Sequence, residues 1–228
     1  MSVLIAIEGI DGSGKGTQSA RLTRELQAQG FNAAMLQFPR YSATTFGAAI
    51  GEFLNGRFGE LNEVHPQLAS VLYAGDRFES RDLLRSMMNQ NDIVVLDRFV
   101  GSNLAHQGAK LSGEERSELI AWIEHIEFAV FGLPRPDLTV LIDMSTDWSR
   151  ELVSRKDARE YTDREADLQE SDLPYLDRVR QCYLQIARGR DDWNVVRGLA
   201  EDGSLRSIED VGQEILETVM RHPAFQVV

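Results

Sequence analysis

The stretch "GIDGSGKGTQ", residues 9–18, combines glycines, a lysine and hydroxyl side chains in the spacing of a phosphate-binding loop. Gly9 to Lys15 fit the pattern G-x-x-x-x-G-K, in which backbone N–H groups face phosphate oxygens and the lysine reaches the β- and γ-phosphates. The alternative is a glycine-rich turn that binds nothing. The phosphate loop is favoured, because an apolar run precedes the stretch and a helical pattern follows it, as this motif requires. The predicted ligands of the nucleotide phosphates are Gly9, Asp11, Gly12, Ser13, Gly14, Lys15, Gly16 and Thr17.

Two positions in this loop are unusual. Gly16 stands where a Ser or Thr would ligate magnesium, and Thr17 comes one residue later, about 100° further around the helix. Because magnesium keeps several waters and is often held through substrate phosphates, the site is weakened but not lost. Asp11 is the second unusual position, because its negatively charged carboxylate would face the phosphates. A carboxylate is explained there if it accepts a hydrogen bond from a sugar hydroxyl or binds a magnesium-bound water. A turn aspartate that faces solvent is the alternative.

Two arginines follow strand-like runs. Arg40 comes after the second apolar run, and Arg98 comes after "DIVVLD", residues 92–97. Open α/β sheets bind anions at the carboxyl ends of their strands, and a guanidinium clamps phosphate through two hydrogen bonds. We therefore expect Arg98 to bind a substrate phosphate, with a surface salt bridge as the alternative. Asp97 is expected to hold magnesium-bound waters or to orient the loop lysine.

Apolar runs alternate with helical patterns along the chain, which is typical of a parallel sheet covered by helices on both faces. The expected strands are residues 3–7, 31–38, 92–97, 137–143 and 193–198. The expected helices are residues 17–29, 44–55, 66–90, 113–131, 146–156, 172–188 and 207–221. Since no repeat, low-complexity tract or linker is evident, the 228 residues are expected to form one α/β domain.

Composition narrows the classes of partner. The formal net charge of -12 argues against nucleic acid, because polyanions bind basic surfaces. A transmembrane helix is not expected, because no apolar run reaches about 18 residues. The N-terminus leads directly into a strand, which does not fit a secretory signal. The single Cys182 excludes an intramolecular disulfide and fits a reducing compartment, so a cytoplasmic protein with a buried cysteine is expected.

Four further motifs make the chain resemble the thymidylate kinase family over nearly its whole length. They are "FPRY" (38–41), "DRF" (97–99), "SNLAHQGAK" (102–110) and "GLPRPDL" (132–138). "GSGKGTQ" is also the form of the loop in adenylate kinases, and the family places an acidic residue at the position of Asp11. The resemblance implies a three-layer P-loop NTPase fold with a short mobile lid. It also implies transfer of a phosphoryl group from ATP, with magnesium, to dTMP, which yields dTDP for dTTP synthesis.

The same resemblance implies a dTMP site. Asp11 would contact the sugar 3'-hydroxyl, and Arg98 would bind the acceptor phosphate. Tyr73 and Arg77 are four residues apart and lie on one helical face. Tyr73 would stack on thymine, Arg77 would hydrogen-bond a base carbonyl, and Asn103 would bind the edge of the ring. For Tyr73, a packing aromatic is the alternative. The implied set is Asp11, Phe38, Pro39, Arg40, Tyr41, Tyr73, Arg77, Arg98, Ser102, Asn103 and His106.

Three positions carry separate expectations. Phe38–Pro39 is a candidate cis peptide bond by analogy with the family. His106 replaces the more usual Tyr or Phe near the 2' side of the sugar, which leaves discrimination against ribonucleotides open. No family role falls at Asp143, so we expect it to cap the end of a strand.

Gly12 stands where some family members carry an arginine, and members without it supply cations from a lid over ATP. The lid is expected at residues 154–166, where Arg155 and Arg159 would stabilise charge on the transferring phosphoryl group. A solvated surface of mixed charge is the alternative. The resemblance implies that Glu170, or Asp172 in its place, would reach the metal or the acceptor. The expected magnesium ligands, directly or through water, are Asp11, Asp97 and Glu170, and the expected catalytic residues are Lys15, Arg98, Asp11, Arg155 and Arg159.

Two rival functions stay open. A kinase of the same fold would act on another acceptor, such as another pyrimidine monophosphate or a deoxynucleoside. A regulatory nucleotide switch is disfavoured, because a guanine-specifying N-K-x-D motif is absent and two arginines crowd the phosphate side.

Family members form homodimers through helices, and the expected helix 113–131 is a candidate interface.

Overall fold

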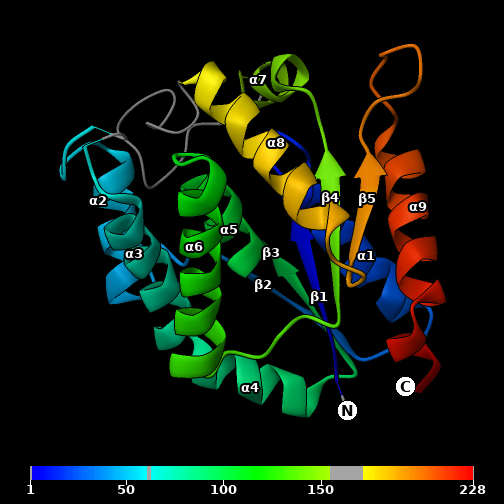
Figure 1. Cartoon of the computed structure of the whole chain (residues 1–228). Coiled ribbons are helices and arrows are strands. Elements are labelled where there is room, and N and C mark those ends of the chain that lie inside the picture. Colours follow the sequence, from blue (N-terminus) through cyan, green and yellow to red (C-terminus); the bar gives the residue numbers. More distant parts are fainter. Residues whose placement is uncertain (1, 61–62, 155–171, 228) are drawn as a thin grey trace.

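Five strands form a parallel sheet in the order β2-β3-β1-β4-β5 (Figure 1). The computed structural model describes residues 2–60, 63–154 and 172–227. The strands are β1 Val3–Glu8, β2 Ala33–Gln37, β3 Ile93–Asp97, β4 Leu138–Asp143 and β5 Trp193–Arg197. All five predicted strands are confirmed, and because β1 is central, the phosphate loop that follows it begins in the middle of the sheet.

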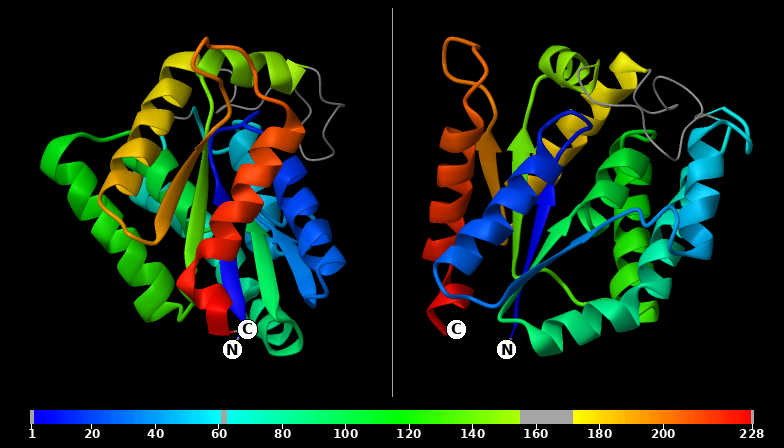
Figure 2. Two further views of the ribbon diagram at one scale, coloured as in Figure 1. Left: turned by 90° about the vertical axis from the view of Figure 1, so that its right-hand side faces the viewer. Right: turned by 180° about the vertical axis from the view of Figure 1, so that it is seen from behind.

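Helices cover both faces of the sheet (Figures 1 and 2). Helices α1 and α9 pack on one face, while α5 and α8 lie over the other with α3 and α6 outside α5. The helices are α1 Lys15–Ala28, α2 Thr45–Leu54, α3 Pro66–Glu79, α4 Arg81–Gln90, α5 Val100–Gly108, α6 Gly113–Glu124, α7 Thr146–Ser154, α8 Leu173–Arg188 and α9 Ile208–Arg221, with the π-helix η1 His125–Val130 and the 3-10 helix η2 Pro223–Val227. The expected α/β fold with helices on both sides of a parallel sheet is confirmed.

The two faces of the sheet carry separate apolar cores. Successive side chains of a strand point to opposite faces, so Leu4 and Ala6 join one core while Val3, Ile5 and Ile7 join the other. All six residues of β1 are buried, which explains why this strand reads as a continuous apolar run that ends in one glutamate. None of the helices in the described ranges has both the length and the apolar character needed to cross a bilayer.

Two helix predictions were wrong in detail, and one helix was missed. The expected helix 66–90 is two helices that meet at Ser80, whose buried hydroxyl accepts a hydrogen bond from Arg40 Nη1 at 3.0 Å. The expected helix 113–131 is α6 followed by the wider turns of η1. Helix α5 was not predicted at all, because it is short and eight of its nine residues are buried, so it lacks the solvated polar face of most helices.

Candidate active site

The loop between β1 and α1 is curled as a phosphate-binding loop must be. Gly12 and Gly14 have φ values of 78° and 88°, the left-handed region that favours glycine. Gly14 is the N-cap of α1, so the positive end of this helix faces the loop. A Cβ on Gly12 would overlap the carbonyl oxygen of Ser149 in α7. A side chain at this position, such as the arginine that other family members carry, would therefore require α7 to shift.

Lys15 and Gly16 begin α1 and face β3. Lys15 is 6% exposed, and its Nζ donates to the main-chain oxygen of Ile10 at 2.6 Å. A Cβ on Gly16 would lie 3.0 Å from Oδ2 of Asp97. A side chain in place of Gly16 would thus press on the carboxylate at the end of β3. Thr17 is exposed on α1.

Asp97 and Arg98 follow one another at the carboxyl end of β3. Burial raises the pKa of Asp97, although the charges of Lys15 and Arg98 oppose the rise. Arg98 has a φ of 65°, which is uncommon for a residue with a side chain and is frequent at functional sites. The chain turns sharply here and aims the guanidinium back at the phosphate loop.

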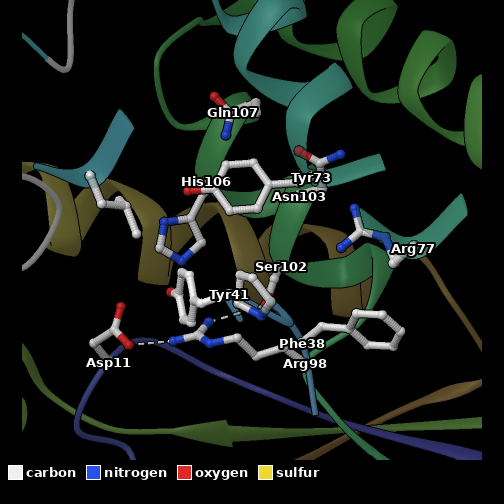
Figure 3. A pocket seen from close by; sticks show the side chains of 12 residues that line it. Asp11, Phe38, Tyr41, Tyr73, Arg77, Arg98, Ser102, Asn103, His106 and Gln107 are labelled. Atoms are coloured by element: carbon white, nitrogen blue, oxygen red, sulfur yellow. Dashed lines mark hydrogen bonds and ion pairs between the residues drawn. The ribbon is translucent and has the colours of Figure 1, made fainter. Parts of the chain in front are cut away.

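Arg98 joins the phosphate loop to α5. It forms an ion pair with Asp11, and its Nη1 donates to Ser102 Oγ at 3.1 Å and to the main-chain oxygen of Gly9 at 3.3 Å. Burial opposes its charge, but the neighbouring acids, chiefly Asp11, raise the pKa of Arg98 well above its ordinary value. The guanidinium is therefore permanently charged and held in one place (Figure 3).

Glu8, which the sequence reasoning did not assign to the site, supports this turn. Its side chain is 0% exposed. Oε1 accepts from the main-chain nitrogens of Phe99 and Ser102 at 2.8 and 3.0 Å, and Oε2 accepts from the hydroxyls of Ser102 and Tyr183 at 2.6 and 2.9 Å. Glu8 thus caps the N-terminus of α5, where backbone donors lack partners within the helix. An acid that ends an apolar strand was the available signal.

A cavity with about 480 Å³ of empty space, part of it open to solvent, lies beyond Arg98 and is bordered by α3, α5 and the segment after β2. Figure 3 shows Asp11 and Arg98 at one end and Arg77 and Asn103 at the other. Its lining comprises Asp11, Phe38, Pro39, Tyr41, Leu54, Tyr73, Arg77, Arg98, Ser102, Asn103, His106 and Gln107. All but one of the residues predicted to bind dTMP line this cavity, together with Leu54 and Gln107, which were not predicted.

A second, larger cavity adjoins the first along the phosphate loop. Its empty space of about 1980 Å³ is lined by loop residues, including Gly12 and Lys15, and by Asp97. Arg40, the exception noted above, lines this cavity. Both cavities share Asp11, Phe38, Pro39, Tyr41 and Arg98. The structure therefore places two compartments on either side of Asp11 and Arg98.

The "FPRY" segment forms the wall between the compartments. The Phe38–Pro39 peptide bond is cis, as predicted. The main-chain nitrogen of Arg40 donates to Oδ2 of Asp76 at 3.0 Å, and Asp76 is fully buried in α3. Asp76 was missed by the sequence reasoning, although it directly precedes Arg77 in "YAGDR".

The far end of the smaller cavity contains a buried ion pair. Tyr73 and Arg77 both face the cavity from α3, which confirms that they share one helical face. Arg77 Nε donates to Oε2 of Glu127 at 2.8 Å, and Arg77 Nη2 pairs with Oε1 of the same side chain. Burial alone would lower the pKa of Arg77, but Glu127 raises it overall. Glu127 was also missed, and a lone acid in the apolar stretch "HIEFAV" was the available signal.

His106 is buried in α5 beside this cavity. Its Nδ1 lies 3.2 Å from the hydroxyl of Tyr175, and that hydroxyl donates to the main-chain oxygen of His106 at 2.9 Å. Nε2 has no hydrogen-bond partner within the described residues. Burial, with a contribution from Arg98, lowers the pKa of His106 to about 3. The imidazole is therefore neutral at physiological pH.

Other predicted residues lie apart or outside the described ranges. Arg155, Arg159 and Glu170 fall outside them, so the roles predicted for these three residues stay predictions. Asp172, the alternative to Glu170, caps α8 by accepting from the nitrogen of Tyr175 at 2.9 Å. Asp143 ends β4 and forms an ion pair with Arg180 at 2.6 Å. Cys182 is a buried free thiol, as expected. Within the described ranges, no group of three or more His, Cys, Asp or Glu side chains forms a metal cluster.

Comparisons with known proteins agree on one family. The family model described as thymidylate kinase matches residues 7–215. The thymidylate kinase of Mycobacterium tuberculosis is 35% identical over 207 residues, which cover 89% of this chain and 95% of that protein. The thymidylate kinase of Leifsonia xyli is 33% identical over 216 residues, covering 93% and 92%. The fold is similar to that of Candida albicans thymidylate kinase, with a TM-score of 0.72 and 24% identity over 98% of this chain and 93% of that one.

Proposed function

The chain belongs to the thymidylate kinase family, and from this premise we propose that it transfers the γ-phosphoryl group of ATP to dTMP. The observation that carries the proposal is the pair of adjoining cavities that share Asp11 and Arg98. One cavity contains the phosphate loop and its lysine, which suits a nucleoside triphosphate. The other is partly aromatic and polar at both ends, which suits a nucleoside monophosphate.

The donor phosphates would lie in the larger cavity. Backbone N–H groups of residues 9–17 and the N-terminus of α1 would bind the phosphate oxygens. Lys15 now donates to the loop carbonyl of Ile10 and would exchange this contact for the β- and γ-phosphates. Because the buried ammonium already lies at the loop, little reorganisation is needed when ATP binds.

The acceptor would lie in the smaller cavity with its phosphate near Arg98. Arg98 is held by Asp11, Ser102 and Gly9, so its charge is in position before the substrate arrives. Asp11 would accept a hydrogen bond from the sugar 3'-hydroxyl. Phe38 and Tyr73 would contact the base, and Arg77 and Asn103 would bind its polar edge.

Magnesium fits the residues at the phosphate loop. Asp97 lines the larger cavity beside Lys15 and Gly16, whereas the carboxylate of Asp11 is already engaged by Arg98. We therefore propose that Asp97 holds magnesium through water molecules, while the phosphates supply direct oxygen ligands. The ion would neutralise charge on the β- and γ-phosphates.

The reaction needs no covalent enzyme intermediate. An oxygen of the dTMP phosphate attacks the γ-phosphorus of ATP, and the bond to the bridging oxygen breaks, so that ADP leaves with the electron pair. The chain contributes alignment of the two phosphates and positive charge from Lys15 and Arg98. Rate enhancement therefore depends on side chains that already face the point where the two cavities meet.

The test is ADP release with ATP and magnesium against a panel of nucleoside monophosphates. We expect the highest kcat/KM with dTMP, a lower value with dUMP, and weak activity with dCMP, AMP and GMP. Highest activity on AMP or UMP, or none on dTMP, would refute the assignment of the acceptor. ATP hydrolysis that no monophosphate stimulates would point to the nucleotide switch instead.

We further propose that the chain acts as one kinase domain, with its lid at residues 154–166. We also propose that it works in the cytoplasm.

We propose that the chain forms a homodimer. The family resemblance supports the dimer, and Leu68, Phe78 and Val130 are exposed apolar side chains on α3 and η1. Light scattering coupled to size-exclusion chromatography would measure the oligomeric state. A monomeric mass at micromolar concentration would contradict the dimer.

A further inference from the structure

Glu127 lies behind the far end of the smaller cavity. It comes from the first turn of η1, it is 0% exposed, and it does not line the cavity itself. Its two carboxylate oxygens accept from Arg77, and Oε1 also accepts from Asn103 Nδ2 at 2.9 Å. One buried carboxylate thus joins two side chains that do line the cavity.

The contacts of Asn103 decide which way its amide points. Nδ2 donates to Glu127 and also to the main-chain oxygen of Ser70 at 3.0 Å. If the amide were flipped, its oxygen would face two acceptors, so the observed orientation is the only one that satisfies both. Oδ1 is then buried with no hydrogen-bond partner among the described residues. Because Asn103 lines the cavity, a molecule bound there would supply the partner that this oxygen lacks.

Arg77 supplies the complementary group. Its pair with Glu127 uses Nε and Nη2 and does not use Nη1, while the side chain borders the cavity. The far end of the cavity therefore combines a fixed donor with a fixed acceptor. Thymine and uracil have a carbonyl acceptor next to an N–H donor on this edge, whereas cytosine has an amino donor next to a ring-nitrogen acceptor.

We propose that Glu127 is a positioning residue for acceptor specificity, which holds Asn103 as an acceptor and Arg77 as a donor. Through these two side chains it favours nucleotides whose base has an imide edge over cytosine nucleotides. The inference rests on the proposed function, since it requires a pyrimidine ring at this end of the cavity. A purely structural ion pair would affect stability without affecting the choice of base.

The test replaces Glu127 by Gln and compares dUMP with dCMP, which differ only at the edge in question. A glutamine cannot accept from both Arg77 and Asn103 with a carboxylate's strength, because one end of its amide is a donor. We expect the ratio of kcat/KM for dUMP to that for dCMP to fall by about tenfold or more, mainly through the KM for dUMP. An equal loss on both substrates, with an unchanged ratio, would overturn the proposal.

Glu124→Gln is the matched control. Glu124 makes the same kind of contact three residues upstream, but its partners are Arg190 and Arg135, outside the smaller cavity. We expect this variant to keep the parent ratio. A fall as large as that in Glu127→Gln would show that any loss of charge from this region alters the ratio, and would also overturn the proposal.

Two further measurements separate the remaining outcomes. Glu127→Asp keeps the charge that Arg77 needs and withdraws the carboxylate from Asn103, so we expect the ratio to fall even if Glu127→Gln is too unstable to assay. In an Asn103→Ala background, Glu127→Gln should lower the ratio much less than in the parent chain. An undiminished effect there would show that Glu127 acts independently of Asn103. Failure of the parent chain to phosphorylate dTMP or dUMP would instead reject the proposed function.

Discussion

Both ends of the smaller cavity are organised by a buried glutamate, but the two glutamates bind different kinds of donor. At the phosphate end, Glu8 accepts from two main-chain nitrogens and two hydroxyls. At the base end, Glu127 accepts from the side chains of Arg77 and Asn103. Glu8 therefore holds the course of the backbone that carries Arg98, whereas Glu127 holds the orientation of the groups that face the base.

The difference indicates how one cavity can separate the groups needed for phosphoryl transfer from the groups that select the acceptor's base. Groups that bind phosphate must be in place for every acceptor, so a backbone-supported turn suits them. Groups that distinguish bases need a defined pattern of donor and acceptor, which oriented side chains supply here.

The largest effect is expected from Arg98. Arg98→Ala removes a permanently charged group from the point where the two cavities meet, and we expect kcat to fall by about 10³-fold or more. Arg98→Lys keeps the charge but not the fork of donors, so it should recover only part of this loss. Steady-state kinetics with dTMP measure both, and a loss confined to KM would contradict the assigned role.

At the base end, the largest expected effect is on stability. Arg77→Leu leaves Glu127 charged and buried without its main partner, and we expect it to lower the free energy of unfolding by about 3–5 kcal/mol. The double variant Arg77→Leu with Glu127→Leu should recover most of that loss, since no unpaired charge is left. Urea unfolding measures both. A double variant as unstable as the single one would show that the charge is not the cause.

A smaller effect is expected where Gly101 contacts Glu8. A Cβ at Gly101 would lie 2.8 Å from Oε1 of Glu8 and 2.9 Å from the ring of Trp193. Gly101→Ala should push the carboxylate off the main-chain nitrogens at the start of α5, and we expect kcat to fall by about tenfold. Tyr183→Phe removes only one of the donors to Glu8 and should cost less. The reverse order of these two variants would argue against Glu8 as the support of Arg98.

The smallest effect concerns His106, between the two ends. With a pKa of about 3 in the native state and an ordinary value of 6.5 when unfolded, His106 is uncharged in both states above pH 6.5. Below that pH the unfolded chain gains a proton that the native chain does not, so stability falls by at most about 1.4 kcal/mol per pH unit until the pH nears 3.

Replacing His106 by Phe should remove this part of the acid loss. The measurement is the difference in unfolding free energy between variant and parent at pH 7.0, 6.0 and 5.0. His125→Asn is the control, because the side chain of His125 is exposed. A parallel decline in the parent and the His106 variant would contradict the burial of a neutral imidazole.

Sequence reasoning predicted residues that line both ends of the smaller cavity but missed the glutamate behind each end. The loop and Arg98 are marked by local spacing next to apolar runs, so both could be predicted. Glu8 and Glu127 act on partners 94 and 50 residues away, and no local pattern indicates those contacts. Helix α5 was missed because it is short and eight of its nine residues are buried, so no polar face alternates with an apolar one.

The most direct test of this division compares Glu8→Gln with Glu127→Gln, by measuring kcat with dTMP and the dUMP-to-dCMP ratio of kcat/KM for each. The account predicts that Glu8→Gln lowers kcat by about tenfold with little change in the ratio, because the turn that carries Arg98 loses its support. Glu127→Gln should chiefly lower the ratio. If both variants show the same profile, the two ends do not act separately, and the account is contradicted.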